Sequence, residues 1–127
     1  MTDGEGDRPL LATNSLRLAF GGVVATNDIT MEVAPGELRG VIGPNGAGKS
    51  TLFGLISGHL RPDAGQVLLT GERIDRLPPH RRAQRGIAIV FQGARLYPGL
   101  SVLDNVAVGA TARTHEGIVA AAIRSRR

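Results

Sequence analysis

Hydrophobic and polar positions alternate in the first third of the chain and later give way to short apolar runs between glycine-rich turns. Residues 15–20 alternate as a half-buried strand does and end at a Gly-Gly turn, and residues 29–33 alternate in the same way. Residues 38–42 form a short run that is apolar on both faces, which predicts a central parallel strand. Residues 66–70 and 87–91 predict two further strands.

Helical spacing first occurs at residues 49–57, where we expect a helix that ends at Gly58. Its predicted buried side carries Leu52, Phe53, Leu55 and Ile56. Residues 78–85 predict a short helix, because proline is tolerated in a first turn. Ser101 is a predicted N-cap, with Asp104 three residues later, for a helix through about Arg113.

A further helix is predicted at residues 116–126. The strand-rich beginning and the later alternation of strands and helices indicate the α/β class. Residues 1–9 are polar and acidic, and we expect them to form a disordered tail.

The chain contains one lysine, Lys49, although Lys and Arg together number fifteen. It lies between a predicted strand and a predicted helix, in a segment that matches G-x-x-x-x-G-K-[S/T] completely. That pattern predicts a phosphate-binding loop. The segment consists of Gly43, Pro44, Asn45, Gly46, Ala47, Gly48, Lys49, Ser50 and Thr51.

The residue types in this loop suit a triphosphate. Gly43, Gly46 and Gly48 lack a Cβ, so the backbone can curl and direct its N–H groups inward. The following helix adds the positive end of its dipole. Lys49 can extend a charge to the β- and γ-phosphates, and Ser50 offers a hydroxyl to Mg²⁺.

The amino-acid composition bears on which other kinds of binding site the chain can contain. The hydrophobic share of 42% is enough for a core, and the absence of cysteine excludes disulfides and thiolate metal sites. The net charge is +4, with a local basic cluster at Arg73, Arg76, Arg81, Arg82 and Arg85. We interpret this cluster as a solvated helix face or a contact with anionic lipid headgroups or another subunit. Aromatic residues are only 3%, so stacking on nucleic acid is not expected.

The loop alone does not choose among kinases, GTPases and ATPases. The neighbouring segments Phe20-Gly21-Gly22, Pro35-Gly36-Glu37-Leu38, Pro78-Pro79-His80 and residues 91–106, together with the loop, resemble ATP-binding cassette (ABC) ATPases. The amino-acid sequences of these segments are most similar to those of the ATPase subunits of branched-chain amino-acid importers. Those of the related amide and urea importers are the next most similar. The resemblance runs from about Leu10 to Ala110, so residues 10–127 resemble part of one ABC domain.

This resemblance implies a P-loop NTPase fold with an N-terminal antiparallel portion, part of a parallel core, and an incomplete sheet. Residues 43–51 would be the Walker A motif, and Phe20 the aromatic that stacks on adenine, worth about 1–3 kcal/mol. Gln92 would be the Q-loop glutamine near Mg²⁺ and the attacking water. The resemblance thus implies ATP and Mg²⁺ as ligands, Lys49 and Gln92 as catalytic residues, and Ser50 and Gln92 at the metal.

The implied function is the ATP-binding subunit of an importer that couples ATP binding and hydrolysis to uptake of branched-chain amino acids or a related small solute. The implied partners are a second cassette, forming a homo- or heterodimer, and membrane permease subunits docked near residues 92–103. The implied location is cytoplasmic, peripheral on the inner face of the cell membrane.

Two other motifs of such cassettes do not occur in the sequence: the Leu-Ser-Gly-Gly-Gln signature and an apolar strand that ends in Asp-Glu, the Walker B motif. Without them we expect this chain alone to lack the groups that position water and close over the γ-phosphate. We also expect an apolar, unpaired edge at residues 38–42. Two alternatives stay open: a truncated nucleotide-binding remnant without turnover, and a soluble ABC protein outside transport.

Overall fold

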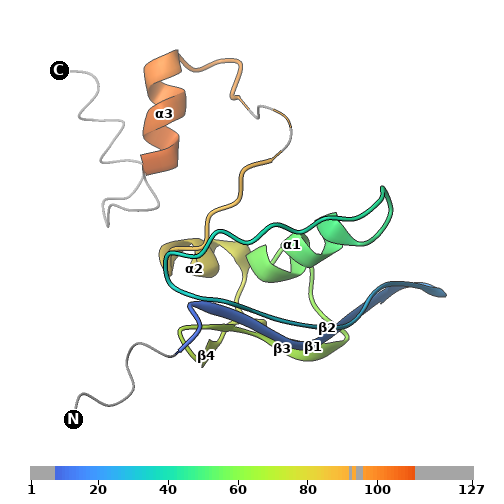
Figure 1. The fold of residues 1–127 in the computed structure, drawn as a ribbon. Helices are drawn as coiled ribbons and strands as arrows, with labels where there is room; N and C mark the ends of the chain where they lie inside the picture. The colour runs from blue at the N-terminus through green and yellow to red at the C-terminus, as the bar shows by residue number, and fades with distance from the viewer. Residues whose placement is uncertain (1–7, 92, 94–95, 111–127) are drawn as a thin grey trace, which may run out of the picture. The chain divides into compact units, whose positions relative to one another are not determined.

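The computed structural model describes residues 8–91, 93 and 96–110, and the chain divides into two units, residues 1–82 and 83–127. The first unit contains a four-stranded antiparallel sheet in the order β2-β1-β3-β4 (Figure 1). Its strands are β1 (Leu11–Phe20), β2 (Val23–Val33), β3 (Ala64–Leu69) and β4 (Glu72–Arg73). The helices of the chain are α1 (Lys49–Ser57), α2 (Pro79–Gln84) and α3 (Val102–Ala110).

The hairpin of β1 and β2 confirms the first two predicted strands, although both begin earlier than the alternation indicates. Leu11 lies opposite Val33 and Phe20 lies opposite Val23. Between these ends the register shifts at bulges, which allows strands of unequal length to pair. β3 confirms the predicted strand at residues 66–70 and pairs with the other side of β1.

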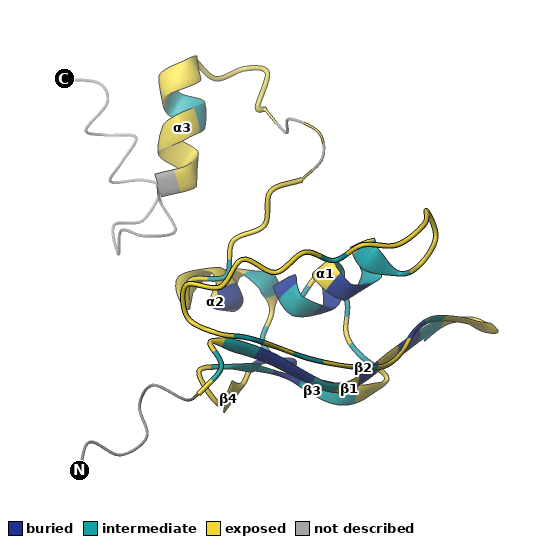
Figure 2. Cartoon of the chain, viewed as in Figure 1, coloured by how far each residue is buried: buried dark blue, intermediate teal, exposed yellow. Residues whose placement is uncertain are grey.

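Helix α1 begins at Lys49 and ends at Ser57, as predicted, with Gly58 as its C-cap. Leu52 and Leu55 are buried with Leu16, Leu18, Val67 and Ile74, which belong to the sheet side of the core (Figure 2). The predicted burial of Phe53 is wrong, because its side chain is 47% exposed. Leu52 and Leu55 are three residues apart and share one stripe of the helix, from which Phe53 is rotated by about 100°.

The predicted parallel strand at residues 38–42 and the predicted strand at residues 87–91 are both wrong. Both segments are outside any strand, and Leu38, Ile42 and Val90 are 99%, 94% and 95% exposed. A strand is stable only when a neighbour satisfies its N–H and C=O groups. Among the described residues no segment pairs with either of them. The expected exposure of apolar side chains in this segment is confirmed for Leu38 and Ile42, but the segment is not the edge of a strand.

The second unit contains α3, whose N-terminus is capped as predicted. The Asp104 N–H donates to Ser101 Oγ at 3.1 Å, and Ser101 Oγ donates to Asp104 Oδ2 at 2.7 Å. The predicted end of this helix at Arg113 and the predicted helix at residues 116–126 lie outside the described residues. Of the helices in the described ranges, none combines the length and apolar character needed to cross a bilayer.

Candidate phosphate-binding site

The glycine loop lies in the first unit and leads directly into α1. Gly48 is the N-cap residue, with a φ of 87°, and no side chain caps this end of the helix. The first turn contains no acidic residue. The helix therefore presents free backbone N–H groups and the positive end of its dipole at the loop, which is the arrangement that favours a bound anion.

Gly48 also fixes the loop against the sheet. A Cβ at this position would overlap the carbonyl oxygen of Ala25 in β2, so only glycine permits this close approach. The loop and the tip of the β1–β2 hairpin thus belong to the same end of the first unit (Figure 1). This contact positions the start of α1 relative to the strands.

The side chain of Lys49 folds back over the loop. Its Nζ donates to the carbonyl oxygen of Gly43 at 2.6 Å and to that of Pro44 at 2.7 Å. An ammonium group has three N–H donors, so one remains for a ligand while these two bonds persist. The only lysine of the sequence therefore places its charge inside the curl of the loop.

The remaining predicted loop residues are accessible. Ser50 is exposed in the first turn of α1, and Thr51 is half-buried. The tip of the loop is exposed as well, at Pro44, Asn45, Gly46 and Ala47. A hydroxyl oxygen such as that of Ser50 is a hard ligand, which Mg²⁺ accepts together with phosphate oxygens and water. The residues present thus fit a magnesium–triphosphate group.

Phe20 lies at the end of β1, next to the Gly21-Gly22 turn, and is 52% exposed. A residue this exposed is not part of the hydrophobic core. It is on the hairpin whose β2 strand contacts Gly48 through Ala25. Gln92, the other residue predicted from the family resemblance, lies outside the described residues.

Thr26 follows Ala25 in β2 and was not expected at this site. It is 6% exposed, and its Oγ1 is buried without a hydrogen-bond partner. Its methyl group is near the position that a side chain at Gly48 would take. The close approach of the loop thus encloses an unsatisfied hydroxyl.

The opposite end of α1 is held by Arg82, which is 1% exposed. Its guanidinium donates to the carbonyl oxygens of Leu55, Ile56, Leu77 and Asp75 at 2.6, 2.9, 2.9 and 2.8 Å. Two of these carbonyls belong to the last turn of α1, where helical partners are lacking. Burial lowers the pKa of Arg82, while the charge of Asp75 opposes this effect.

Arg82 is buried, so the interpretation of the five clustered arginines as a solvated helix face is wrong for this residue. A Cβ at Gly58 would lie 2.7 Å from Arg82 Nε, so the glycine after α1 leaves room for the guanidinium. Arg73 is also engaged, because its Nε donates to Asp75 Oδ1 at 2.7 Å and its Nη2 to Asp75 Oδ2 at 3.0 Å. Asp75 raises the pKa of Arg73 through this hydrogen bond and its charge.

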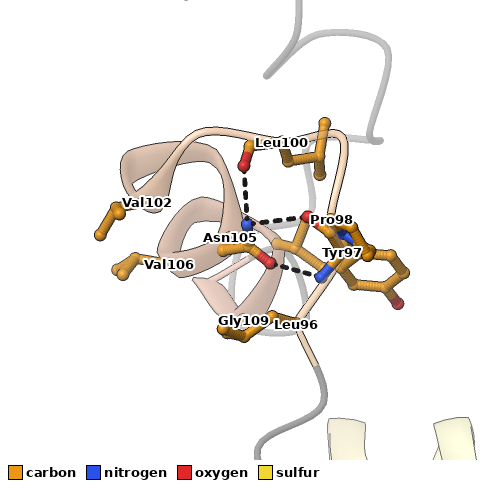
Figure 3. A pocket seen from close by; sticks show the side chains of 9 residues that line it. Leu96, Tyr97, Pro98, Leu100, Val102, Asn105, Val106 and Gly109 are labelled. Carbon is orange, nitrogen blue, oxygen red and sulfur yellow. Dashed lines mark hydrogen bonds between the residues drawn. The ribbon is translucent and has the colours of Figure 1, made fainter.

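The second unit has an apolar groove of about 560 Å³ beside α3 (Figure 3). The described residues that line it are uncharged: Leu96, Tyr97, Pro98, Leu100, Val102, Asn105, Val106, Val108 and Gly109. It overlaps the segment predicted to dock a membrane partner. In the described part of the chain, no group of three or more His, Cys, Asp or Glu residues could hold a metal ion.

Comparison with known proteins shows which family this chain is similar to. The family model described as "ABC transporter" matches residues 26–126. LivG of Escherichia coli K12, a high-affinity branched-chain amino acid transport ATP-binding protein, is 34% identical over 118 residues, which are 93% of this chain and 46% of LivG. The ribose import ATP-binding protein RbsA 2 of Streptomyces avermitilis is 41% identical over 112 residues, 88% of this chain and 22% of that protein.

Among solved structures, an ATP-binding subunit of an ABC transporter superposes with a TM-score of 0.73 at 30% identity. The superposition covers 84% of this chain and 44% of that subunit. The chain thus spans about half, or less, of the length of the relatives that it matches.

Proposed function

Because the chain belongs to the ABC transporter family of ATP-binding proteins, we propose that it is the ATP-binding part of an importer. It would couple ATP binding and hydrolysis to the uptake of branched-chain amino acids or a related small solute. The observation that carries this proposal is the position of Lys49, whose ammonium lies inside an exposed glycine loop at the uncapped start of α1.

Binding of ATP would replace the carbonyl oxygens that now accept hydrogen bonds from Lys49 with phosphate oxygens. Its bonds to the carbonyl oxygens of Gly43 and Pro44 are made to neutral acceptors, and phosphate oxygens are stronger acceptors because they are charged. The N–H groups at the start of α1 would complete the cradle. The dipole of the helix would add about 0.3–1 kcal/mol for an anion at this end.

Ser50 would hold Mg²⁺ through its hydroxyl, with Gln92 as the second protein group near the metal. When bound, Mg²⁺ neutralises charge on the phosphates. Phe20 would stack on the adenine, which its exposed position at the end of β1 permits. In the transfer step Lys49 would stabilise the developing charge on the γ-phosphate, and Gln92 would orient the attacking water.

The solute is proposed from the relatives. LivG is named for branched-chain amino acids, and the segments that flank the glycine loop also resemble the ATPase subunits of branched-chain amino-acid importers. RbsA 2, in contrast, is named for ribose. We therefore place branched-chain amino acids first and another small solute second. The partners would be a second cassette and permease subunits, and the location would be the inner face of the cell membrane.

A second candidate function is nucleotide binding without turnover. The observation that favours it is the glycine loop with Lys49, which offers groups that hold phosphates whether or not they are cleaved. A third candidate is a soluble ABC protein outside transport that acts on DNA or ribosomes, which the basic cluster of arginines suggests. The burial of Arg82 and the pairing of Arg73 with Asp75 reduce the charge available for that role.

Three measurements separate these candidates. The full chain is co-expressed with the permease subunits of a branched-chain amino-acid importer from the same cell, and its membrane association, ATP binding and phosphate release are recorded. Association with the permease together with ATP binding supports the importer proposal. ATP binding with no phosphate release, even in the presence of the permease, supports the candidate without turnover, and recovery with nucleic acid instead supports the third.

A further inference from the structure

Among the side chains that the structure describes, the hydroxyl of Thr26 is the one buried polar group without a hydrogen-bond partner. Only 6% of this residue is exposed. A buried hydroxyl that makes no hydrogen bond destabilises the fold around it, because the bonds it made with water are lost on folding. Buried polar groups are nearly always paired, so the exception at Thr26 calls for a physical reason.

Thr26 lies beside the N-cap of α1. The preceding residue, Ala25, brings its carbonyl oxygen so close to Gly48 that a Cβ there would overlap the oxygen. The γ-methyl carbon of Thr26 is 3.6 Å from the position of that Cβ. Ala25 and Thr26 are thus the part of the sheet on which the end of the glycine loop rests. A shift of the loop at Gly48 therefore acts first on these two residues.

The strand β2 is irregular immediately before Thr26. Thr26 lies opposite Leu18 of β1. The adjacent pair joins Val24 to Ala19, so Ala25 is an extra residue without a place in the pairing. Such a β-bulge bends the strand and changes the direction in which nearby groups point, and bulges are common next to functional sites. The residue whose carbonyl approaches the loop is therefore the bulged one.

A second irregularity follows Thr26. Pairing resumes with Ile29 opposite Leu16, so two residues of β2 lie opposite one residue of β1. Asp28, one of these two, has a φ of 53°, in the left-handed region that is unfavourable for residues with a side chain. Strained backbone of this kind is found most often where the surrounding structure holds a functional group in place. Thr26 is thus held against the loop by bulges on both sides.

Thr13 shows what a structural threonine does in the same sheet. It is fully buried, and its Oγ1 donates to the carbonyl oxygen of Ile29 at 3.0 Å, so its hydroxyl stabilises the fold. The hydroxyl of Thr26 does not, although valine has nearly the same shape and would avoid the cost. The hydroxyl at this position therefore points to a second state of the loop, in which it has a partner.

We propose that Thr26 is a positioning residue whose hydroxyl hydrogen-bonds the backbone of the loop at Gly48 once phosphates occupy the loop. This inference rests on the proposed binding of ATP. Without a ligand, the ammonium of Lys49 closes the loop on itself through the carbonyl oxygens of Gly43 and Pro44.

Phosphate oxygens compete for the ammonium of Lys49 because they are charged, and the loop backbone is then released to take other partners. A hydroxyl can donate or accept, so Thr26 suits either an N–H or a carbonyl of the loop. The bond formed with it strengthens binding, since the cost of the unpaired hydroxyl is present only before the ligand arrives.

The test titrates the full chain with Mg·ATP and separately with magnesium tripolyphosphate, which lacks the nucleoside. Thr26→Val should bind both ligands about 5- to 10-fold more weakly than the wild type, the equivalent of one hydrogen bond. The thermal midpoint of the ligand-free variant should meanwhile rise by about 4–8 °C, because the unpaired hydroxyl is gone. Stability and affinity thus change in opposite directions, whereas damage to the fold would lower both.

Two further variants serve as controls. Thr26→Ser keeps the hydroxyl and loses the methyl group, so it should lose stability and yet bind Mg·ATP within about 2-fold of the wild type. Thr13→Val removes a hydroxyl that already has a partner, so it should lower the thermal midpoint and leave the affinity unchanged.

The outcomes separate this inference from the proposed function. Saturable ATP binding by the wild type with equal affinity in Thr26→Val overturns the positioning role and leaves the ATP site in place. A loss of affinity accompanied by a lower midpoint in Thr26→Val overturns it as well, and so does a loss for ATP but not for tripolyphosphate, which would place Thr26 at the nucleoside. Absence of saturable ATP binding by the wild type overturns the proposed function itself.

Discussion

Arg82 Nη1 donates a hydrogen bond to the carbonyl oxygen of Leu55 at 2.6 Å, in the last turn of the helix that begins at Lys49. The glycine loop and a buried guanidinium thus lie at opposite ends of one nine-residue helix. A short helix depends on its surroundings rather than on its own propensity. The position of the loop therefore depends on the contacts of α1 at both ends.

Replacing Arg82 with methionine should destabilise the first unit by about 2–4 kcal/mol, because several buried carbonyl groups lose a charged donor. Arg76→Met, at an exposed arginine of the first unit, should change the free energy of unfolding by no more than about 0.5 kcal/mol. Denaturant unfolding of both variants checks this. Equal effects at the two positions would show that Arg82 does not stabilise α1 through these bonds.

Thr26 and Thr13 are both buried, but only one of their hydroxyl groups has a hydrogen-bond partner. Substituting each of them therefore measures what an unsatisfied buried hydroxyl costs. Thr13 Oγ1 donates to the Ile29 carbonyl at 3.0 Å, whereas Thr26 Oγ1 has no partner. Thr26→Val should therefore raise the free energy of unfolding by about 1 kcal/mol, and Thr13→Val should lower it by a similar amount. Thermal unfolding measures both, and a loss of stability in Thr26→Val would contradict the assignment of an unsatisfied hydroxyl.

The stability of the first unit should depend on pH through Asp75. Burial by itself would raise the pKa of this carboxyl, but the hydrogen bonds from Arg73 and from the Val67 N–H, with the charge of Arg73, lower it overall. A lowered pKa contributes stability that is present above about pH 4 and is lost as the pH falls through the folded-state pKa. Asp75→Asn should flatten this acid limb of the stability curve. An identical acid dependence in wild type and variant would refute the role of Asp75.

The sequence predicts the elements whose signals are local. The start of α1 at Lys49, its end at Gly58 and the Ser101 cap of α3 follow from single residues with strong positional preferences. The predicted strands at residues 38–42 and 87–91 fail because an apolar run says nothing about whether a partner strand is available. For the site, the glycines, lysine and serine of the loop could be identified from the sequence because they are adjacent in the chain, and their binding of phosphate stays a prediction.

The contacts made at long range could not be predicted. Arg82 is adjacent to Arg81 and has the same chemistry, and only the packing of α2 near Gly58 distinguishes them. Asn105 offered a weaker signal, because asparagine disfavours helix interiors and bonds to nearby backbone instead. Its four hydrogen bonds reach three residues, Tyr97, Leu100 and Ser101, which lie four to eight residues earlier in a segment without a periodic pattern.

The loop contains two glycines with left-handed φ values that differ in their surroundings. Gly46 has a φ of 84° and open space around it, whereas a Cβ at Gly48 would overlap the Ala25 carbonyl. Gly46→Ala should cost about 1–2 kcal/mol of stability through backbone strain alone. Gly48→Ala should cost more and also displace the loop from β2, so that ATP affinity falls further than in Gly46→Ala. Equal ATP affinities of the two variants would contradict the role of this contact.

The central claim, that Lys49 and its loop bind the phosphates of ATP, is tested most directly by equilibrium titration of the full chain with Mg·ATP. The wild type should saturate, and Lys49→Ala should bind about 100-fold more weakly, as expected for the loss of a charged hydrogen-bonding group. Arg76→Ala, which removes an exposed positive charge elsewhere in the first unit, should bind as the wild type does. Undiminished affinity in Lys49→Ala would contradict the assignment of the site.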